Sequence, residues 1–127
     1  MPEFRTRPLE RGPLLAELAA TCEALGQAGI SQASVSFGWD SNLPIGEMWK
    51  EQVVPVQDIA DSVATSEANG VSRIGRSDVF VEFPGFLLTL CHEGDLHVAG
   101  EGPLVVAVVD RWRALGYAPY ELSNPDA

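Results

Sequence analysis

The chain has 127 residues, of which 46% are hydrophobic and 20% charged, and its formal net charge is −10. A chain of this size and composition is expected to fold as one globular domain around a single core. The excess of carboxylates argues against nucleic acid as a partner, because such binding depends on neutralising phosphates with Lys and Arg. No apolar run is long enough to predict a membrane span.

The first element expected in chain order is a polar arm over residues 1–11, which contains Pro2 and Pro8 and is predicted to be extended and poorly ordered. A single domain is expected over residues 12–122. Its first helix is predicted to begin at Pro13, a residue favoured in the first turn. Leucines recur at helical spacing as far as Leu25, and glycines follow.

Residues 33–39 alternate between apolar and small polar side chains, which predicts a strand. An irregular loop is expected over 40–52, followed by a helix from Pro55 to about Asn69, where Asn-Gly ends it. Residues 71–74 are predicted to be a short edge strand or a linker.

The clearest pattern runs from Val79 to Val98 and predicts three antiparallel strands. Pro84-Gly85 is a typical turn dipeptide. A three-residue loop over 92–94 places Gly94 at a left-handed bulge position. This register pairs Phe83 with Phe86 and Leu90 with Leu96. It gives one wholly apolar face: Val79, Val81, Phe83, Phe86, Leu88, Leu90, Leu96 and Val98. A slip by one residue would turn this face towards water, so burial is expected to select the pairing.

A last helix is predicted from Pro103 to Leu115, then a short strand within 117–122 and a frayed tail over 123–127. The expected order is therefore α-β-α-β-β-β-α. Hairpin-linked strands with helices on one face predict an α+β two-layer sandwich with a mainly antiparallel sheet. The pairing of strand 33–39 is left open between an edge position and a parallel neighbour.

The best candidate for partner binding is the irregular loop, because Trp and Met are enriched at interfaces. The acidic face of the second helix is expected to steer a basic protein partner. The candidate binding residues are Trp39, Asp40, Asn42, Met48, Trp49, Asp58, Asp61 and Glu67. The alternative reading is that the two tryptophans only close the core.

The densest polar cluster lies at the second hairpin and contains both histidines of the chain. Cys91, His92, Asp95 and His97 are the candidate metal ligands or catalytic groups there, since a thiolate and an imidazole can bind zinc or act as nucleophile and base. Their spacing matches no common zinc pattern, so a polar hairpin tip is the alternative. No cofactor is expected.

The cysteines, Cys22 and Cys91, are expected to be free thiols in a reducing compartment, because no secretory leader pattern is present. A disulfide between them is the alternative. The leading functional hypothesis is a cytoplasmic, non-catalytic protein-binding module of the inhibitor, immunity or adaptor kind. The alternatives are a small metal-dependent or thiol enzyme and a self-associating protein that forms a homodimer.

Overall fold

The computed structural model describes residues 2–38, 41–44, 46–48 and 50–122, and it contains a seven-stranded, wholly antiparallel open sheet. The strands are β1 (Glu3–Arg5), β2 (Gln32–Phe37), β3 (Gln52–Pro55), β4 (Val79–Phe83), β5 (Phe86–Leu90), β6 (Leu96–Gly100) and β7 (Tyr120–Glu121). Their order across the sheet is β3-β2-β4-β5-β6-β1-β7.

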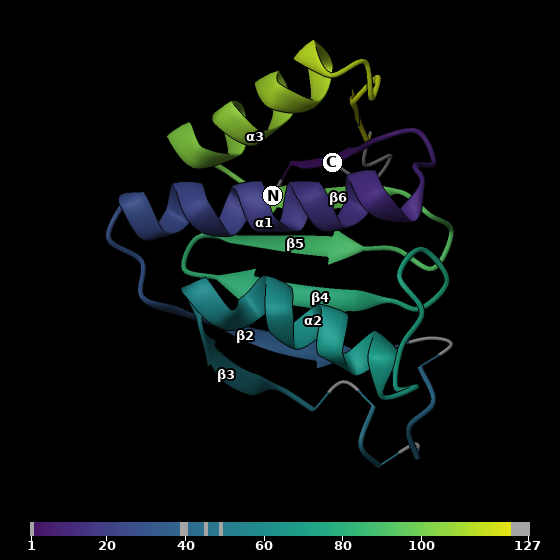
Figure 1. Cartoon of the computed structure of the whole chain (residues 1–127). Coiled ribbons are helices and arrows are strands. Elements are labelled where there is room, and N and C mark those ends of the chain that lie inside the picture. The colour runs from purple at the N-terminus through teal and green to yellow at the C-terminus, as the bar shows by residue number, and fades with distance from the viewer. Residues whose placement is uncertain (1, 39–40, 45, 49, 123–127) are drawn as a thin grey trace.

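Three helices cover one face of this sheet (Figure 1). They are α1 (Arg11–Gln27), α2 (Ile59–Ala68) and α3 (Pro103–Ala114), and a 3₁₀ turn at Val56–Asp58 leads into α2. The α+β two-layer sandwich predicted from the sequence is confirmed. None of the described helices has the length and apolar character needed to cross a bilayer.

The strands β4, β5 and β6 form a central meander, and they pair in the predicted register. Phe83 pairs with Phe86 across the first turn, and their rings stack with centroids 5.0 Å apart. Leu90 pairs with Leu96 across the second turn, where Gly94 has a φ of +90°. Such a backbone conformation favours glycine, as the bulge prediction required.

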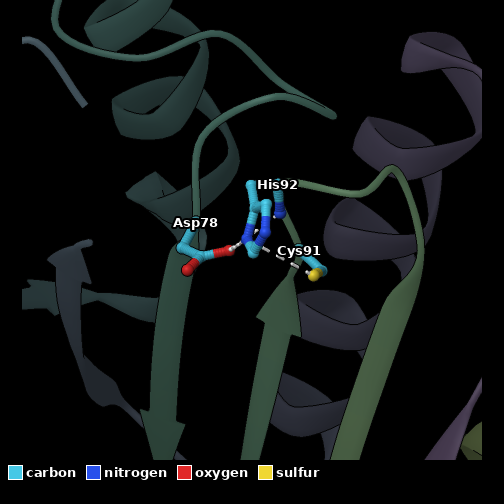
Figure 2. Close-up of side chains that lie close together, drawn as sticks. All are labelled: Asp78, Cys91 and His92. Carbon is cyan, nitrogen blue, oxygen red and sulfur yellow. Dashed lines mark hydrogen bonds and ion pairs between the residues drawn. The ribbon is translucent and has the colours of Figure 1, made fainter. Parts of the chain in front are cut away.

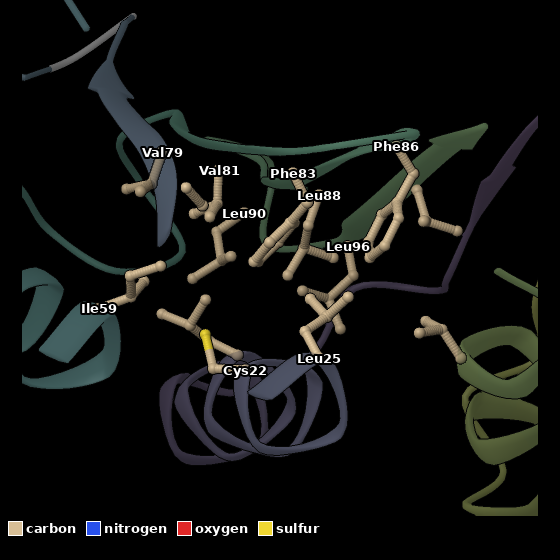
Figure 3. Packing of buried hydrophobic residues seen from close by; sticks show 14 of the residues in the cluster. Cys22, Leu25, Ile59, Val79, Val81, Phe83, Phe86, Leu88, Leu90 and Leu96 are labelled. Atoms are coloured by element: carbon tan, nitrogen blue, oxygen red, sulfur yellow. The ribbon is translucent and has the colours of Figure 1, made fainter. Parts of the chain in front are cut away.

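The core lies between the apolar face of the meander and the helices, as Figure 3 shows with α1 running below the strands. All eight apolar side chains predicted for this face are buried. Leu14, Leu18 and Leu25 of α1 and Ile59 of α2 pack against them and are at most 1% exposed. Burial of apolar surface on this scale is the dominant favourable term in folding.

The structure corrects the prediction of a poorly ordered arm over 1–11. Glu3–Arg5 form β1, which pairs with β6 and with β7. The backbone N–H of Thr6 donates to Leu96 O, and that of Leu9 donates to Gly94 O. The arm is ordered because the free edge of β6 offers backbone groups that would otherwise be unpaired.

Two further segments differ from their predictions. Gln52–Pro55 form the edge strand β3 where the end of a loop and the start of a helix were expected, so the helix begins later, at Ile59. Residues 71–74 form no extended strand, and only an isolated bridge joins Ile74 to Ser77. β2 is antiparallel to both β3 and β4, which settles the pairing that the sequence left open.

A buried charge joins the helices α1 and α3. Glu17 of α1 is 1% exposed, and both of its carboxylate oxygens accept hydrogen bonds from the Arg111 guanidinium of α3, at 2.9–3.1 Å. The Arg111 side chain itself is half exposed. Because a buried carboxylate without a partner is costly, this bidentate pair fixes α3 against α1.

We expect Arg111→Ala to lower the free energy of unfolding by about 2–4 kcal/mol, because it leaves the Glu17 carboxylate buried and unpaired. Arg113→Ala is the matched control on the same helix, since Arg113 pairs with Asp110 where both side chains are 64% exposed. Its loss should cost less than about 1 kcal/mol. Urea unfolding measures both, and equal effects would contradict this role for Glu17.

Candidate functional site

The face of the sheet opposite the helices, here called the open face, is covered by none of the described helices. The register places side chains across it in rows. One row runs from β3 to β1 and contains Val53, Ser34, Glu82, Leu87, Ala99 and Glu3. The next row contains Ser36, Phe80, Thr89, His97, Arg5 and Tyr120. The open face thus mixes apolar, polar and charged groups.

A cluster of Cys, His and Asp side chains lies at the end of this face, where β5 turns into β6. The backbone N–H of Cys91 donates to Asp95 O, and that of Gly94 donates to Cys91 O, so the hairpin geometry is fixed. The structure therefore brings Cys91, His92, Asp95 and His97 together, as the sequence predicted.

Asp78, which directly precedes β4, is the residue of this cluster that the sequence analysis missed. Its Oδ1 lies 2.7 Å from His92 Nδ1 and accepts a hydrogen bond from the His92 backbone N–H, also at 2.7 Å. Figure 2 shows the His92 ring between Asp78 and Cys91. The signal was available, because the register that pairs Val79 with Leu90 also places Asp78 beside Cys91.

Asp95 and His97 form the other side of the cluster. His97 Nε2 lies 2.8 Å from Asp95 Oδ2, and both side chains are nearly buried. Asp95 Oδ1 is also buried, yet it accepts no hydrogen bond from an N–H or O–H group of the described residues. A buried carboxylate oxygen without a partner is rare in native proteins and requires a physical explanation.

The Cys91 thiol is 6% exposed and is not activated as a nucleophile. Burial raises its pKa to about 12 and outweighs the opposing backbone N–H of Glu93, and a side-chain hydrogen bond with Asp95 and the charges of Asp95 and Asp78 add to the increase. His92 Nδ1 is the ring nitrogen nearest to Cys91 Sγ, at 3.8 Å, and the same nitrogen contacts Asp78. In a catalytic triad, one ring nitrogen of the histidine contacts the nucleophile and the other contacts the carboxylate, so this arrangement is not a triad.

The structure describes five of the eight residues predicted to bind a partner. Trp39, Asp40 and Trp49 lie outside the described residues. Asn42 is exposed and Met48 is half-buried in the segment between β2 and β3. Asp58 and Asp61 are exposed in the helical layer, away from the open face, whereas Glu67 is engaged by the Arg11 guanidinium and by the Ile74 backbone N–H.

A hollow of about 350 Å³ on the open face was not anticipated. It lies beside the edge strand β3 and is lined by Gln32, Ala33, Ser34, Glu51, Val53, Glu82, Phe83 and Pro84. Glu51 and Glu82 are exposed and make no ion pair with any described residue, and Val53 is 64% exposed. The hollow therefore combines two unpaired carboxylates with an exposed apolar side chain.

No protein-family model, curated protein or solved structure matches this chain. The function is accordingly inferred from the geometry and chemistry of the residues described above.

Both thiols should resist alkylation in the native protein at pH 8. Cys22 is 5% exposed and burial raises its pKa to about 11, so it and Cys91 stay protonated at that pH. We expect mass spectrometry after iodoacetamide treatment to find neither thiol modified in the native state and both modified in guanidinium chloride. Rapid native modification of Cys91 with Cys22 spared would instead indicate an activated nucleophile.

Proposed function

We propose that this protein is a non-catalytic protein-binding module that captures a basic partner at the hollow beside β3. The observation that carries the proposal is the pair of unpaired carboxylates, Glu51 and Glu82, in a hollow of the sheet face that the helices leave uncovered. A Lys or Arg side chain of the partner would enter the hollow and neutralise both carboxylates.

The backbone of β3 supports this mode of binding. β3 lies at the edge of the sheet, and no described strand pairs with the N–H and C=O groups on its outer side. An extended segment of the partner would add to this edge as a further strand, with backbone hydrogen bonds for affinity and side chains in the hollow for specificity. Val53 would then pack beneath an apolar residue of that segment.

The charge of the whole chain favours such a partner. A net charge of −10 raises the rate of encounter with a basic protein at low ionic strength. Asp58 and Asp61 contribute to this long-range attraction from the helical layer without contacting the partner. We place the interaction in a reducing compartment such as the cytoplasm, because both cysteines are free.

The thiol chemistry of the hairpin supports a binding role over an enzymatic one. Cys91 is a buried, protonated thiol. No described histidine has one ring nitrogen hydrogen-bonded to this thiol and the other to a carboxylate, which is the arrangement that would activate it. Binding in the hollow needs no such activation.

The test is affinity capture from the native lysate with the wild-type chain and with the double variant Glu51→Gln/Glu82→Gln. We expect a basic protein to bind wild type at 50 mM salt, to be weakened at 300 mM salt, and to lose at least about tenfold in affinity for the double variant, which corresponds to about 1.4 kcal/mol.

The matched control is Glu10→Gln/Glu23→Gln, which changes the net charge equally but lies on the helical side, where both residues are exposed. The control should retain the partner. Equal losses in the two double variants would mean that only net charge matters and would contradict a site in the hollow. A dimeric mass for the purified chain, abolished by Val53→Glu, would instead favour self-association through this face.

A further inference from the structure

A second feature of the open face is independent of the hollow, namely the polar cluster at the β5–β6 hairpin. Its potential ligand atoms form two sets of three that share Cys91 Sγ. Within each set the atoms lie within 4.8 Å of one another. The first set adds Asp78 and His92, and the second adds Asp95 and His97.

Such separations are close to those around a bound metal ion. With metal–sulfur and metal–nitrogen distances of about 2.3 and 2.0 Å, ligand atoms of a tetrahedral site lie roughly 3.3–3.6 Å apart. The ligand atoms of this cluster therefore need to move by about 1 Å, which rotation about side-chain bonds provides. The hairpin backbone can stay in place, because the hydrogen bonds between Cys91, Gly94 and Asp95 hold it.

The second set is the one that lacks a partner for a buried charge. Asp95 Oδ1 is buried and accepts no hydrogen bond from an N–H or O–H group of the described residues, while Asp95 Oδ2 forms a hydrogen bond with His97 Nε2. In the first set, by contrast, Asp78 Oδ1 already receives the backbone N–H of His92 and faces its ring. A cation placed among Cys91, Asp95 and His97 would give Asp95 Oδ1 a positively charged partner. It would also replace the proton in the hydrogen bond between Asp95 Oδ2 and His97 Nε2.

We propose that Cys91, Asp95 and His97 form a binding site for one divalent transition metal ion of the zinc class. The donor set decides the class of metal. One sulfur, one imidazole nitrogen and one carboxylate oxygen suit Zn²⁺ or Co²⁺, whereas Mg²⁺ and Ca²⁺ prefer oxygen ligands only. On loading, the Cys91 S–H proton is released to solvent as the sulfur–metal bond forms, and the proton of the Asp95–His97 hydrogen bond leaves as well, to solvent or to the other ring nitrogen of His97.

The neighbouring residues support the site without ligating the ion. Asp78 contacts the His92 ring and holds it beside Cys91. The Asp78 carboxylate also adds a negative charge near the cation. Three protein ligands leave a fourth position on the metal for water or for a group of a bound partner. The bound ion would fix the β5–β6 hairpin at the end of the open face opposite Pro84-Gly85.

The test uses the full chain after treatment with a chelator and desalting. Titration with Co²⁺ should give one equivalent of bound metal, with visible d–d bands of a four-coordinate ion and a thiolate-to-cobalt charge-transfer band in the near ultraviolet. Stoichiometric Zn²⁺ should abolish these bands and raise the melting temperature, because a ligand that binds only the native state stabilises it. Excess Mg²⁺ should do neither.

Variants assign the ligands. Cys91→Ser should abolish the charge-transfer band, and both His97→Ala and the nearly isosteric Asp95→Asn should weaken Co²⁺ binding at least tenfold. Cys22→Ser is the matched control and should bind as wild type does, whereas His92→Ala should still bind one equivalent of Co²⁺ and keep the charge-transfer band. Circular dichroism confirms that each variant is folded, and Asp95→Asn retains a hydrogen-bonding group in case His97→Ala unfolds.

Absence of the charge-transfer band at stoichiometric Co²⁺ in the wild type would overturn the proposal. Loss of binding in His92→Ala with retention in His97→Ala would also overturn it, since the ion would then occupy the other set of ligand atoms. Neither result depends on the capture of a basic partner, because Glu51 and Glu82 belong to the hollow on another part of the open face.

Discussion

The register of the meander β4-β5-β6 is the constraint on which the rest of the structure depends. Antiparallel pairing with alternating side chains sends eight apolar residues to the helical side and every intervening residue to the open face. A shift by one position would turn Glu82 towards the helices and expose Leu88 and Leu90, so the apolar contacts with α1 hold this pairing in place. The helices follow from it, because they need one apolar surface on which to pack.

The same alternation builds both candidate sites. Glu82 and Ser34 stand side by side on the open face because the pairing of β2 with β4 places them there, and Val53 follows from the pairing of β2 with β3. Cys91 and Asp95 face each other because the pairing of β5 with β6 continues into the turn. One sheet face therefore supplies the core, and its reverse supplies a hollow with carboxylates at one end and a thiol–imidazole–carboxylate cluster at the other.

The sequence predicts the parts of the fold in which the paired residues lie close together in the chain. The meander and its register were predictable, because each hairpin joins residues close in the chain and the apolar alternation excludes other pairings. The cluster of Cys91, His92, Asp95 and His97 was predictable for the same reason. β1 was not, since a three-residue segment with two charged side chains carries no strand pattern, and Phe4 finds its partner Val98 only after the intervening chain has folded.

The hollow beside β3 could not be predicted from the sequence for a related reason. The hollow combines Glu51, Glu82 and Ser34 from three separate segments, and no local signal relates them. β3 was not predicted, because Gln52 was placed in a loop and Pro55 at the start of a helix, and this segment becomes a strand only by pairing with β2. The predicted aromatic binding loop was selected by composition and the acidic helix face by helical spacing, and partner binding by both stays a prediction.

The central claim is that the register of the meander decides which side of the sheet is core, and two adjacent residues of β5 test it most directly. Leu88 is fully buried on the helical side, whereas Leu87 is half-buried on the open face. Urea unfolding should show that Leu88→Thr loses about 3 kcal/mol of stability and Leu87→Thr less than about 1 kcal/mol, since threonine favours strands but leaves a cavity and a hydroxyl in the core. Equal losses, or a greater loss at Leu87, would contradict the register and with it the placement of both sites.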